Sequence, residues 1–276
     1  MPELPEVETV RKTLYPLLLH HKIIDVRVFM NKVIKTSTPQ IFINKIIGQT
    51  INDIKRVGKL IIFVLDDYVL LSHLRMEGKY YYQKQDTPTN WKHILLVLEL
   101  ENNYQLCYHD TRQFGTFHLQ PLSTYQTLKP YTNIGPEPFN KIVTAQYLQN
   151  KWKNKKQNIK ASLLDQGVMS GLGNIYVDEV LFYANIHPES ITNHLTLVQL
   201  QTIIDKSIMV LTKAIKLGGS SINSYTSSLG VRGYYQNSLQ VHTRVNQSCF
   251  ACTTKILKTK VSTRGTYFCP HCQSKY

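Results

Sequence analysis

The first residues of the chain combine a potential nucleophile with a potential proton carrier. The sequence begins MPELPEVETV, so removal of Met1 would leave Pro2 with a free secondary amine. An α-amino group titrates near pH ~8, so part of it is unprotonated at neutral pH and can attack a sugar carbon to form a Schiff base. The carboxyl group of Glu3 could move protons beside it. Alternatively, Pro2 and Glu3 simply begin a helix, because proline suits a first turn and acids suit a helix N-terminus.

Four of the five cysteines have the spacing of a metal site. Cys249 and Cys252 form one CxxC pair, and Cys269 and Cys272 form a second pair after residues 253–268. Each pair places two thiolates on one tight turn, and the segment between them is long enough for a β-hairpin. Four sulfur ligands leave no open position, so we expect one structural Zn²⁺; two unrelated CxxC pairs or a redox motif are the alternatives. Cys107, in a predicted strand, is expected to be an ordinary buried residue.

The composition favours a polyanionic partner. Lys and Arg outnumber Asp and Glu by 32 to 18, which gives a formal net charge of +14. Nucleic acid and an anionic membrane surface both fit such an excess. No apolar run reaches the ~18 residues of a membrane-spanning helix, and acidic residues stand where a signal peptide would carry basic ones. We therefore expect a cytoplasmic protein without a membrane partner and without a disulfide scaffold.

Hydrophobic periodicity divides the chain into a strand-rich part and a helical part. A helical pattern at 6–19 precedes short β-branched or aromatic runs at 23–30, 51–57, 60–65, 68–74, 79–83, 93–100 and 104–109. This density of strands predicts a β-sandwich or barrel up to about residue 125. A Pro- and Gly-containing stretch within 121–140 predicts a linker. Helices are then predicted at 145–153, 159–166, 174–184 and 196–217, and the cysteine-bearing tail is a third, small unit.

Basic residues gather in places where phosphate could bind. One group precedes Gly171 and Gly173, and glycines that open a helix expose backbone N–H groups to an anion. A second group lies between the two CxxC pairs. Each group could equally be a solvated face. The residues concerned are Lys151, Lys153, Lys155, Lys156 and Lys160 in the first group, and Lys255, Lys258, Lys260 and Arg264 in the second.

Several separated motifs together resemble the formamidopyrimidine-DNA glycosylases, a family that excises oxidised purines from DNA and then nicks the strand. The motifs include the N-terminal MPELPEVETV, GLGNIYVDEVLF at 171–182 and RGTYFCP at 264–270. The resemblance runs from Pro2 to Cys272. It implies an α+β fold with a leading helix and an N-terminal catalytic β-sandwich (1–125), a linker (126–140), a helix–two-turn–helix DNA-binding domain (141–240) and a C-terminal zinc-finger β-hairpin (241–276).

The resemblance also implies a reaction and the residues that perform it. Pro2 would attack C1′ of the sugar while Glu3 manages proton transfer, and β- and δ-eliminations would leave a one-nucleotide gap. Lys59 would contact phosphate near the amine and assist catalysis. Arg264 would contact DNA at the lesion and help the final elimination. The expected substrate is double-stranded DNA with oxidised purines, such as 8-oxoguanine and formamidopyrimidines, or with abasic sites. A bacterial-type, nucleoid-associated monomer is expected.

Further DNA contacts follow from the same resemblance. Met76, Arg112 and Phe114 match the residues that fill the space left by a flipped-out base, a task that needs apolar or planar side chains. Glu6 matches a residue near the flipped lesion. The remaining implied contacts are to the DNA backbone, and they are assigned to His93, Lys156, Lys160 and Asn174.

The chain departs from the family pattern at three places. Ile94 and Leu95 stand where an Asp-x-His continuation usually follows Lys92-His93. Gln113 occupies a position that is commonly basic. Val231-Arg232 gives an unfamiliar pattern to the loop 220–235, which aligns with the lesion-covering loop.

Two other interpretations remain open from the sequence. The endonuclease VIII-like glycosylases, which act on oxidised pyrimidines, share the N-terminal proline and the helix–turn motif. A non-enzymatic zinc-ribbon protein that binds nucleic acid would share the charge and the cysteines. The PELPE start and the trio of Met76, Arg112 and Phe114 argue against both.

Overall fold

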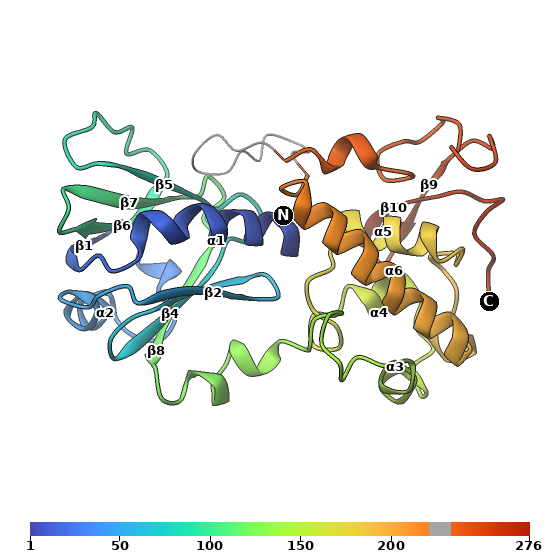
Figure 1. Ribbon diagram of the computed structural model, residues 1–276, viewed down its shortest axis with the longest axis horizontal. Helices are drawn as coiled ribbons and strands as arrows, with labels where there is room; N and C mark the ends of the chain where they lie inside the picture. Colours follow the sequence, from blue (N-terminus) through green and yellow to red (C-terminus); the bar gives the residue numbers. More distant parts are fainter. Residues whose placement is uncertain (221–232) are drawn as a thin grey trace. The chain divides into compact units, whose positions relative to one another are not determined.

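The computed structural model describes residues 1–220 and 233–276, and these form two compact units (Figure 1). The first unit is Met1–Thr132 together with the described residues of Gly218–Gly233, and the second is Asn133–Leu217 with Tyr234–Tyr276. The domain boundaries given above, with a linker and a separate C-terminal unit, stay a prediction. In the described part of the chain, no helix is both long enough and apolar enough to cross a membrane.

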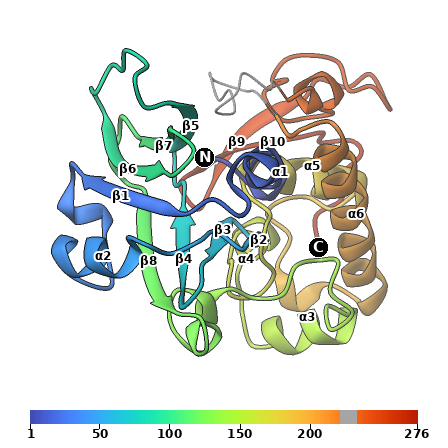
Figure 2. The ribbon, with the colours of Figure 1, turned by 60° about the vertical axis from the view of Figure 1, so that its left-hand side comes forward.

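The first unit is a helix followed by two four-stranded antiparallel sheets (Figure 2). One sheet has the order β1-β6-β7-β5 and the other β2-β3-β4-β8. Apolar residues of α1 and of both sheets, including Val7, Phe63 and Leu106, form one core. The elements are α1 (Leu4–Leu18), β1 (Ile23–Val28), α2 (Pro39–Ile46), β2 (Asp53–Val57), β3 (Leu60–Val64), β4 (Tyr68–His73), β5 (Lys79–Lys84), β6 (Ile94–Leu100), β7 (Tyr104–His109) and β8 (Thr116–Pro121), with short 3₁₀ turns at Asn31–Val33, Tyr125–Thr127 and Tyr131–Asn133.

The seven strands expected from the sequence are all present, and two further elements were not anticipated. Helix α2 is short and rich in isoleucine, so its pattern does not separate helix from strand; Thr38 caps it by accepting from the Ile41 N–H. Strand β8 ends in Pro121 and lies at a sheet edge, where a missing N–H is tolerated. Its pairing with β4 makes β8 the fourth strand of the second sheet.

Helix α1 begins earlier than its hydrophobic period suggests. Glu3 is the N-cap, Pro5 stands in the first turn, and a reciprocal capping box joins Glu3 and Glu6. The Glu3 N–H donates to Glu6 Oε2 at 2.8 Å. Because this motif satisfies N–H groups that a helix end otherwise leaves unpaired, the helix starts at Leu4.

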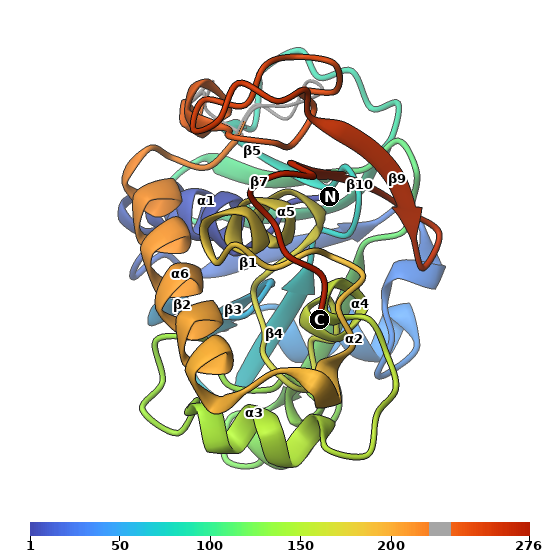
Figure 3. The same ribbon diagram turned by 90° about the vertical axis from the view of Figure 1, so that its right-hand side faces the viewer.

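The second unit is helical with one β-hairpin (Figure 3). Helix α5 is buried along Tyr176–Phe182 and packs against both α6 and β10. It therefore forms the centre of the unit. The elements are α3 (Ala145–Trp152), α4 (Ile159–Leu163), α5 (Asn174–Tyr183), α6 (Leu197–Lys216), β9 (Leu257–Val261) and β10 (Arg264–Phe268), with 3₁₀ turns at Thr192–His194 and Tyr235–Ser238.

Helix α4 is shorter than its predicted range of 159–166. The residues after Leu163 form the turns that lead to α5. The side-chain amide of Gln166 donates to the carbonyl groups of Leu164 and Leu172, and its oxygen accepts from the Gly171 N–H. Gln166 thus satisfies backbone groups of the turns between the two helices instead of extending α4. The predicted α+β class, with a β-sandwich, a helix–two-turn–helix domain and a cysteine-bearing hairpin, is confirmed.

Candidate functional site

The N-terminal residues are buried at the start of α1. Pro2 is buried behind a half-exposed Met1, and Glu3 and Glu6 retain only 2% and 4% of their accessible surface. Glu6 Oε2 accepts from the Glu3 N–H, and Glu6 Oε1 accepts from the Ser220 N–H at 2.7 Å. One carboxylate therefore joins the predicted catalytic residues to Ser220, which directly precedes residues 221–232. Those residues, with Val231-Arg232 and most of the predicted lesion-covering loop, lie outside the described part of the chain.

Lys59 stands in the two-residue turn between β2 and β3. Gly58 has a φ of +56° there, a backbone conformation that glycine adopts without strain. Lys59 itself is buried to 5% exposure. Its strand neighbour Leu60 pairs directly with His73 of β4, so the register brings His73 close to the lysine turn.

His73 lies beside the lysine turn and was not identified from the sequence. Burial, together with the positive charges of Arg75, Lys59 and His118, lowers its pKa to about 3. The ring is therefore neutral at physiological pH. Its Nδ1 accepts from the Arg75 N–H at 2.9 Å, so the hydrogen of the neutral ring belongs on Nε2. His73 thus offers a neutral N–H donor beside a lysine, and only the pairing of β3 with β4 could reveal this.

The structure brings together the two loops that carry Met76, Arg112 and Phe114. Gly78 and Gly115 both lie against the hydroxyl end of Tyr108, so closely that a Cβ at either glycine would approach its oxygen to 2.2 or 1.8 Å. A hydrogen bond between Glu77 and Thr111 joins the same loops. Phe114 is 52% exposed, and the Arg112 guanidinium lies 5.0 Å from the centre of its ring. Met76 is half-buried.

Asp110 holds the Arg112–Phe114 loop, and no motif in the sequence pointed to it. It is fully buried, and its two carboxylate oxygens accept from the N–H groups of Arg112 (3.0 Å), Phe114 (2.9 Å) and Gly115 (2.8 Å). Gln113 takes a φ of +57° within this turn. The exposed Phe114 thus stands on a loop whose backbone is held by three hydrogen bonds to Asp110, a contact that a carboxylate after a predicted strand could have suggested.

His93 lies just before β6 with a φ of +68°, and its carbonyl oxygen accepts from the Asp110 N–H. The His93 ring meets the His109 ring edge-on at 5.8 Å. Ile94 and Leu95, which replace the usual polar continuation, are both buried. The unusual residues after His93 are therefore part of the interior and are not surface groups.

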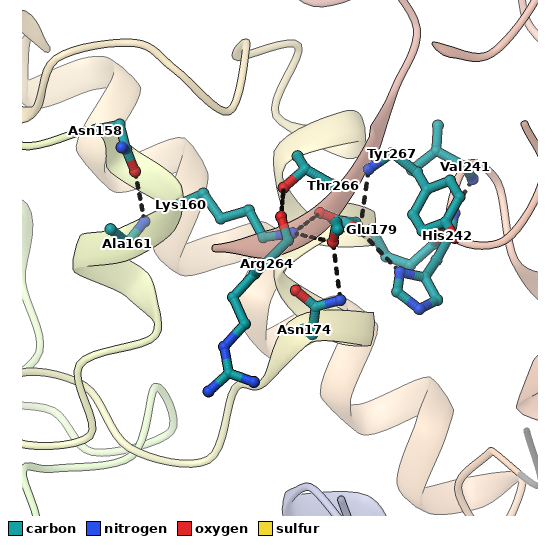
Figure 4. A network of polar contacts seen from close by, with 12 residues as sticks. Asn158, Lys160, Ala161, Asn174, Glu179, Val241, His242, Arg264, Thr266 and Tyr267 are labelled. Atoms are coloured by element: carbon teal, nitrogen blue, oxygen red, sulfur yellow. Dashed lines mark hydrogen bonds and ion pairs between the residues drawn. The ribbon is translucent and has the colours of Figure 1, made fainter. Parts of the chain in front are cut away.

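In the second unit, Lys160 is at the centre of a buried polar network (Figure 4). Its side chain has no exposed surface, and its ammonium group lies 2.7 Å from Asp178 Oδ1. The other oxygen of Asp178 is 2.8 Å from His242 Nδ1. Glu179 accepts hydrogen bonds from the three backbone N–H groups of residues 240–242. In this conformation Lys160 is not placed where it could touch a phosphate group.

The same network fixes the backbone next to Arg264. Lys160 Nζ and Asn174 Nδ2 each donate to the carbonyl oxygen of Gly265 at 3.0 Å. Gly265 directly follows Arg264 in β10, and the Arg264 side chain is exposed. Lys160 and Asn174, both predicted to bind DNA, therefore hold the strand that carries Arg264, another predicted DNA contact. Lys156, by contrast, is exposed and available to solvent.

The four cysteines predicted to bind metal come together at the base of this hairpin. Their sulfur atoms all lie within 4.8 Å of one another, and the sulfurs of Cys252 and Cys269 are 3.4 Å apart. Cys249 and Cys269 are buried, and Cys252 and Cys272 are partly exposed. Such a closed sulfur set is consistent with a bound metal. Cys107 is buried in β7, and burial raises the pKa of its thiol to about 11.

Comparisons with known proteins decide the family. The model of the formamidopyrimidine-DNA glycosylase N-terminal domain matches residues 1–117, and that of the formamidopyrimidine-DNA glycosylase H2TH domain matches residues 134–226. The chain belongs to the formamidopyrimidine-DNA glycosylase family. This confirms the resemblance inferred from the motifs and sets aside the endonuclease VIII-like and zinc-ribbon interpretations.

Relatives in the formamidopyrimidine-DNA glycosylase family match the chain over its full length. It is 45% identical to a formamidopyrimidine-DNA glycosylase of Bacillus licheniformis, with all of both chains covered. It is 41% identical to one of Ureaplasma parvum over 99% of this chain and all of that protein. Crystal structures of the Lactococcus lactis Fpg protein with DNA are similarly close. The complex with Fapy-dG DNA and the complex with abasic-site DNA both have a TM-score of 0.91, at 42% and 41% identity, and cover 99% of this chain and all of theirs.

Proposed function

We propose that the chain is a bifunctional DNA glycosylase and AP lyase of base excision repair. Its substrate is double-stranded DNA that contains oxidised purines, such as 8-oxoguanine and formamidopyrimidines, or abasic sites. The observation that carries this proposal is full-length similarity to Lactococcus lactis Fpg, which was crystallised with Fapy-dG DNA and with abasic-site DNA. The buried N-terminal residues and the exposed Phe114 support it.

The chemistry starts at Pro2 once Met1 has been removed. The proline nitrogen forms a bond to C1′ as the bond from C1′ to the damaged base breaks, and the sugar ring opens to an iminium. Glu3 supplies and accepts the protons of these steps. The iminium acidifies C2′, so loss of a C2′ proton expels the 3′ phosphate, and a second elimination expels the 5′ phosphate. The partly exposed Met1 is consistent with its removal.

The surrounding residues bind and deform the DNA. Lys59 offers a cation and His73 a neutral N–H donor to phosphate near the lesion. Met76, Arg112 and Phe114 fill the gap that the extruded nucleotide leaves, because a flipped base must be replaced in the stack. Glu6 holds Ser220, at the start of the segment expected to cover the lesion. Contacts from His93, Lys156 and Asn174 to the backbone provide affinity without sequence readout.

For Lys160 we propose a supporting role in place of the phosphate contact expected from the sequence. Its ammonium group neutralises Asp178 inside the protein and holds the Gly265 carbonyl. Arg264 is then presented on a fixed strand to the DNA, where it assists the final elimination. A buried lysine can therefore affect DNA processing without meeting DNA.

The four cysteines are proposed to hold one structural Zn²⁺. The ligands are the sulfur atoms of Cys249, Cys252, Cys269 and Cys272. Such a site stabilises the hairpin and leaves no open coordination position for catalysis. The protein is proposed to act as a monomer on chromosomal DNA in the cytoplasm.

Borohydride trapping tests the proposed reaction. Incubation with 8-oxoguanine or abasic-site DNA and borohydride should give a stable protein–DNA adduct that maps to the N-terminal peptide. Glu3→Gln should keep DNA binding and lose base excision, because the amide keeps the shape but cannot cycle a proton. An adduct at Lys59, or full activity of a form that retains Met1, would contradict the mechanism.

A further inference from the structure

A charged cluster, formed by Glu8 and Arg11 of α1 and Arg56 of β2, has no part in the proposed chemistry. The Glu8 carboxylate accepts from Arg11 Nη2 of the same helix at 2.7 Å and from Arg56 Nε of β2 at 2.9 Å. The exposed fractions of the Glu8, Arg11 and Arg56 side chains are 13%, 22% and 11%. Burial alone would raise the pKa of Glu8, but hydrogen bonds and positive charge from both arginines outweigh it and hold the pKa below 4.5. The carboxylate is therefore charged at physiological pH.

The two arginines contact different parts of the β2–β3 hairpin. Arg11 Nη1 donates to the Ile54 carbonyl oxygen, within β2, at 3.3 Å. Arg56 Nη1 donates to the Gly58 carbonyl oxygen, within the turn, at 2.9 Å. The Gly58 carbonyl and the Lys59 nitrogen belong to one planar peptide unit, so a bond to that oxygen also fixes the direction in which the chain enters Lys59.

We propose that Glu8 and Arg56 are positioning residues, which hold the Lys59 turn in register with the helix that carries Pro2 and Glu3. The connection runs from the Glu8 carboxylate through the Arg56 guanidinium to the Gly58 carbonyl. This inference rests on the proposed function, in which Pro2 and Lys59 act on neighbouring groups of one nucleotide.

The chemistry of the guanidinium group suits this task. Hydrogen bonds with an ionised partner are shorter and stronger than neutral ones, and the planar fork of arginine fixes the angle between its two acceptors. Lysine has three donors on a rotating ammonium group but no rigid fork that fixes the angle between them. A catalytic group that moves by about 1 Å can lose about 100-fold in rate, so precise placement of the turn matters.

The chain offers a matched control for a test. Arg56→Gln removes the connection to the Lys59 turn, and Arg11→Gln removes the other arginine from the same carboxylate while the Arg56–Gly58 contact stays. The readout is the single-turnover rate of borohydride-trapped adduct on abasic-site DNA at saturating protein. We expect Arg56→Gln to slow trapping by about 10- to 100-fold, with DNA affinity within about twofold of the parent and Arg11→Gln within about threefold of the parental rate.

A second background separates positioning from general destabilisation. In a Lys59→Ala protein, Arg56→Gln should cause no further loss of trapping rate, because the group that it positions is already gone. The proposal would be overturned if the losses of trapping rate in Arg56→Gln and Lys59→Ala multiply in the double variant. It would also be overturned if Arg11→Gln and Arg56→Gln lose trapping rate equally.

Amide hydrogen exchange tests the connection without activity. Peptides that contain Gly58 and Lys59 should exchange at least about tenfold faster in Arg56→Gln than in Arg11→Gln; equal rates would overturn the proposal. If the parent protein forms no adduct at Pro2, the proposed function fails, and hydrogen exchange still decides whether Arg56 holds the turn.

Discussion

The Ser220 N–H donates to Glu6 Oε1 at 2.7 Å, although the two residues are separated by 214 positions in the chain. The second oxygen of the same carboxylate accepts from the Glu3 N–H. Glu6 therefore connects a predicted catalytic residue at the N-terminus to Ser220, the last described residue before 221–232. Any substitution that disturbs Glu6 should affect both.

Gly219→Ala should destabilise the first unit by more than backbone strain alone. Gly219 has a φ of +78°, and an added Cβ would lie 2.5 Å from Glu6 Oε1. The matched control is Gly48→Ala, since Gly48 has a φ of +85° and nothing within 4 Å of the added carbon. Left-handed backbone costs roughly 1–2 kcal/mol in either variant. Denaturant unfolding should show a further loss of about 1–2 kcal/mol in Gly219→Ala; equal losses would contradict the Glu6 contact.

Asp178→Asn should strongly destabilise the second unit. The substitution leaves the Lys160 ammonium group buried without its charged partner, and breaking such a pair costs about 3–5 kcal/mol. Asp53→Asn is the control, because the Lys55 and Asp53 side chains are 56% and 35% exposed and 3.5 Å apart. Such solvent-accessible pairs contribute about 0–1 kcal/mol. Chemical denaturation measures both. A small effect of Asp178→Asn would mean that Lys160 is not held as the structure describes.

Lys156→Ala should weaken binding to lesion and undamaged DNA by similar factors. Lys156 is exposed, and a phosphate contact carries no base information. The plot of log affinity against log salt should become shallower by about 0.9 for the lost contact. Fluorescence anisotropy at several salt concentrations provides the slope, and an unchanged slope would remove Lys156 from the interface.

His73 should make the folded state sensitive to acid. Its pKa is about 3 in the folded protein, against 6.5 for an ordinary histidine. Its contribution to stability is complete above pH 6.5 and is lost as the pH falls towards 3, because only the unfolded chain takes up the proton. The slope approaches ~1.4 kcal/mol per pH unit. His73→Gln should flatten the stability curve between pH 6.5 and 4; an unchanged curve would show that the folded protein does not hold the His73 ring neutral.

Cys269→Ser, or removal of metal by a chelator, should abolish DNA binding while the first unit stays folded. The hairpin contributes Cys249, Ile256 and Cys269 to a small core that it shares with Phe182 of α5 and with Val241. Such small units depend on metal for their shape. Metal content and DNA binding should fall together, and circular dichroism should retain the β-sheet signal. Strand nicking at the parental rate by metal-free protein would contradict this.

Features whose signal is local were predictable from the amino-acid sequence. The MPELPEVETV start, the two CxxC pairs and the excess of basic residues predicted a family, a catalytic pair and a metal site. Neighbouring residues in the chain carry each of these patterns, so no knowledge of the fold was needed. The seven strands followed from alternation for the same reason, whereas α2 and β8 were missed because their short patterns are ambiguous.

Contacts between distant side chains, in contrast, became visible only in the folded chain. A lysine in a basic run was expected at the surface, yet Lys160 is buried because α5 supplies Asp178 and β10 supplies a carbonyl group to its ammonium. His73 lies next to the lysine turn only through the register of β3 with β4, and Glu6 meets Ser220 only in the folded chain. Composition reports how many charges a chain has, but burial and pairing depend on contacts between residues far apart in sequence, and those exist only once the core has formed.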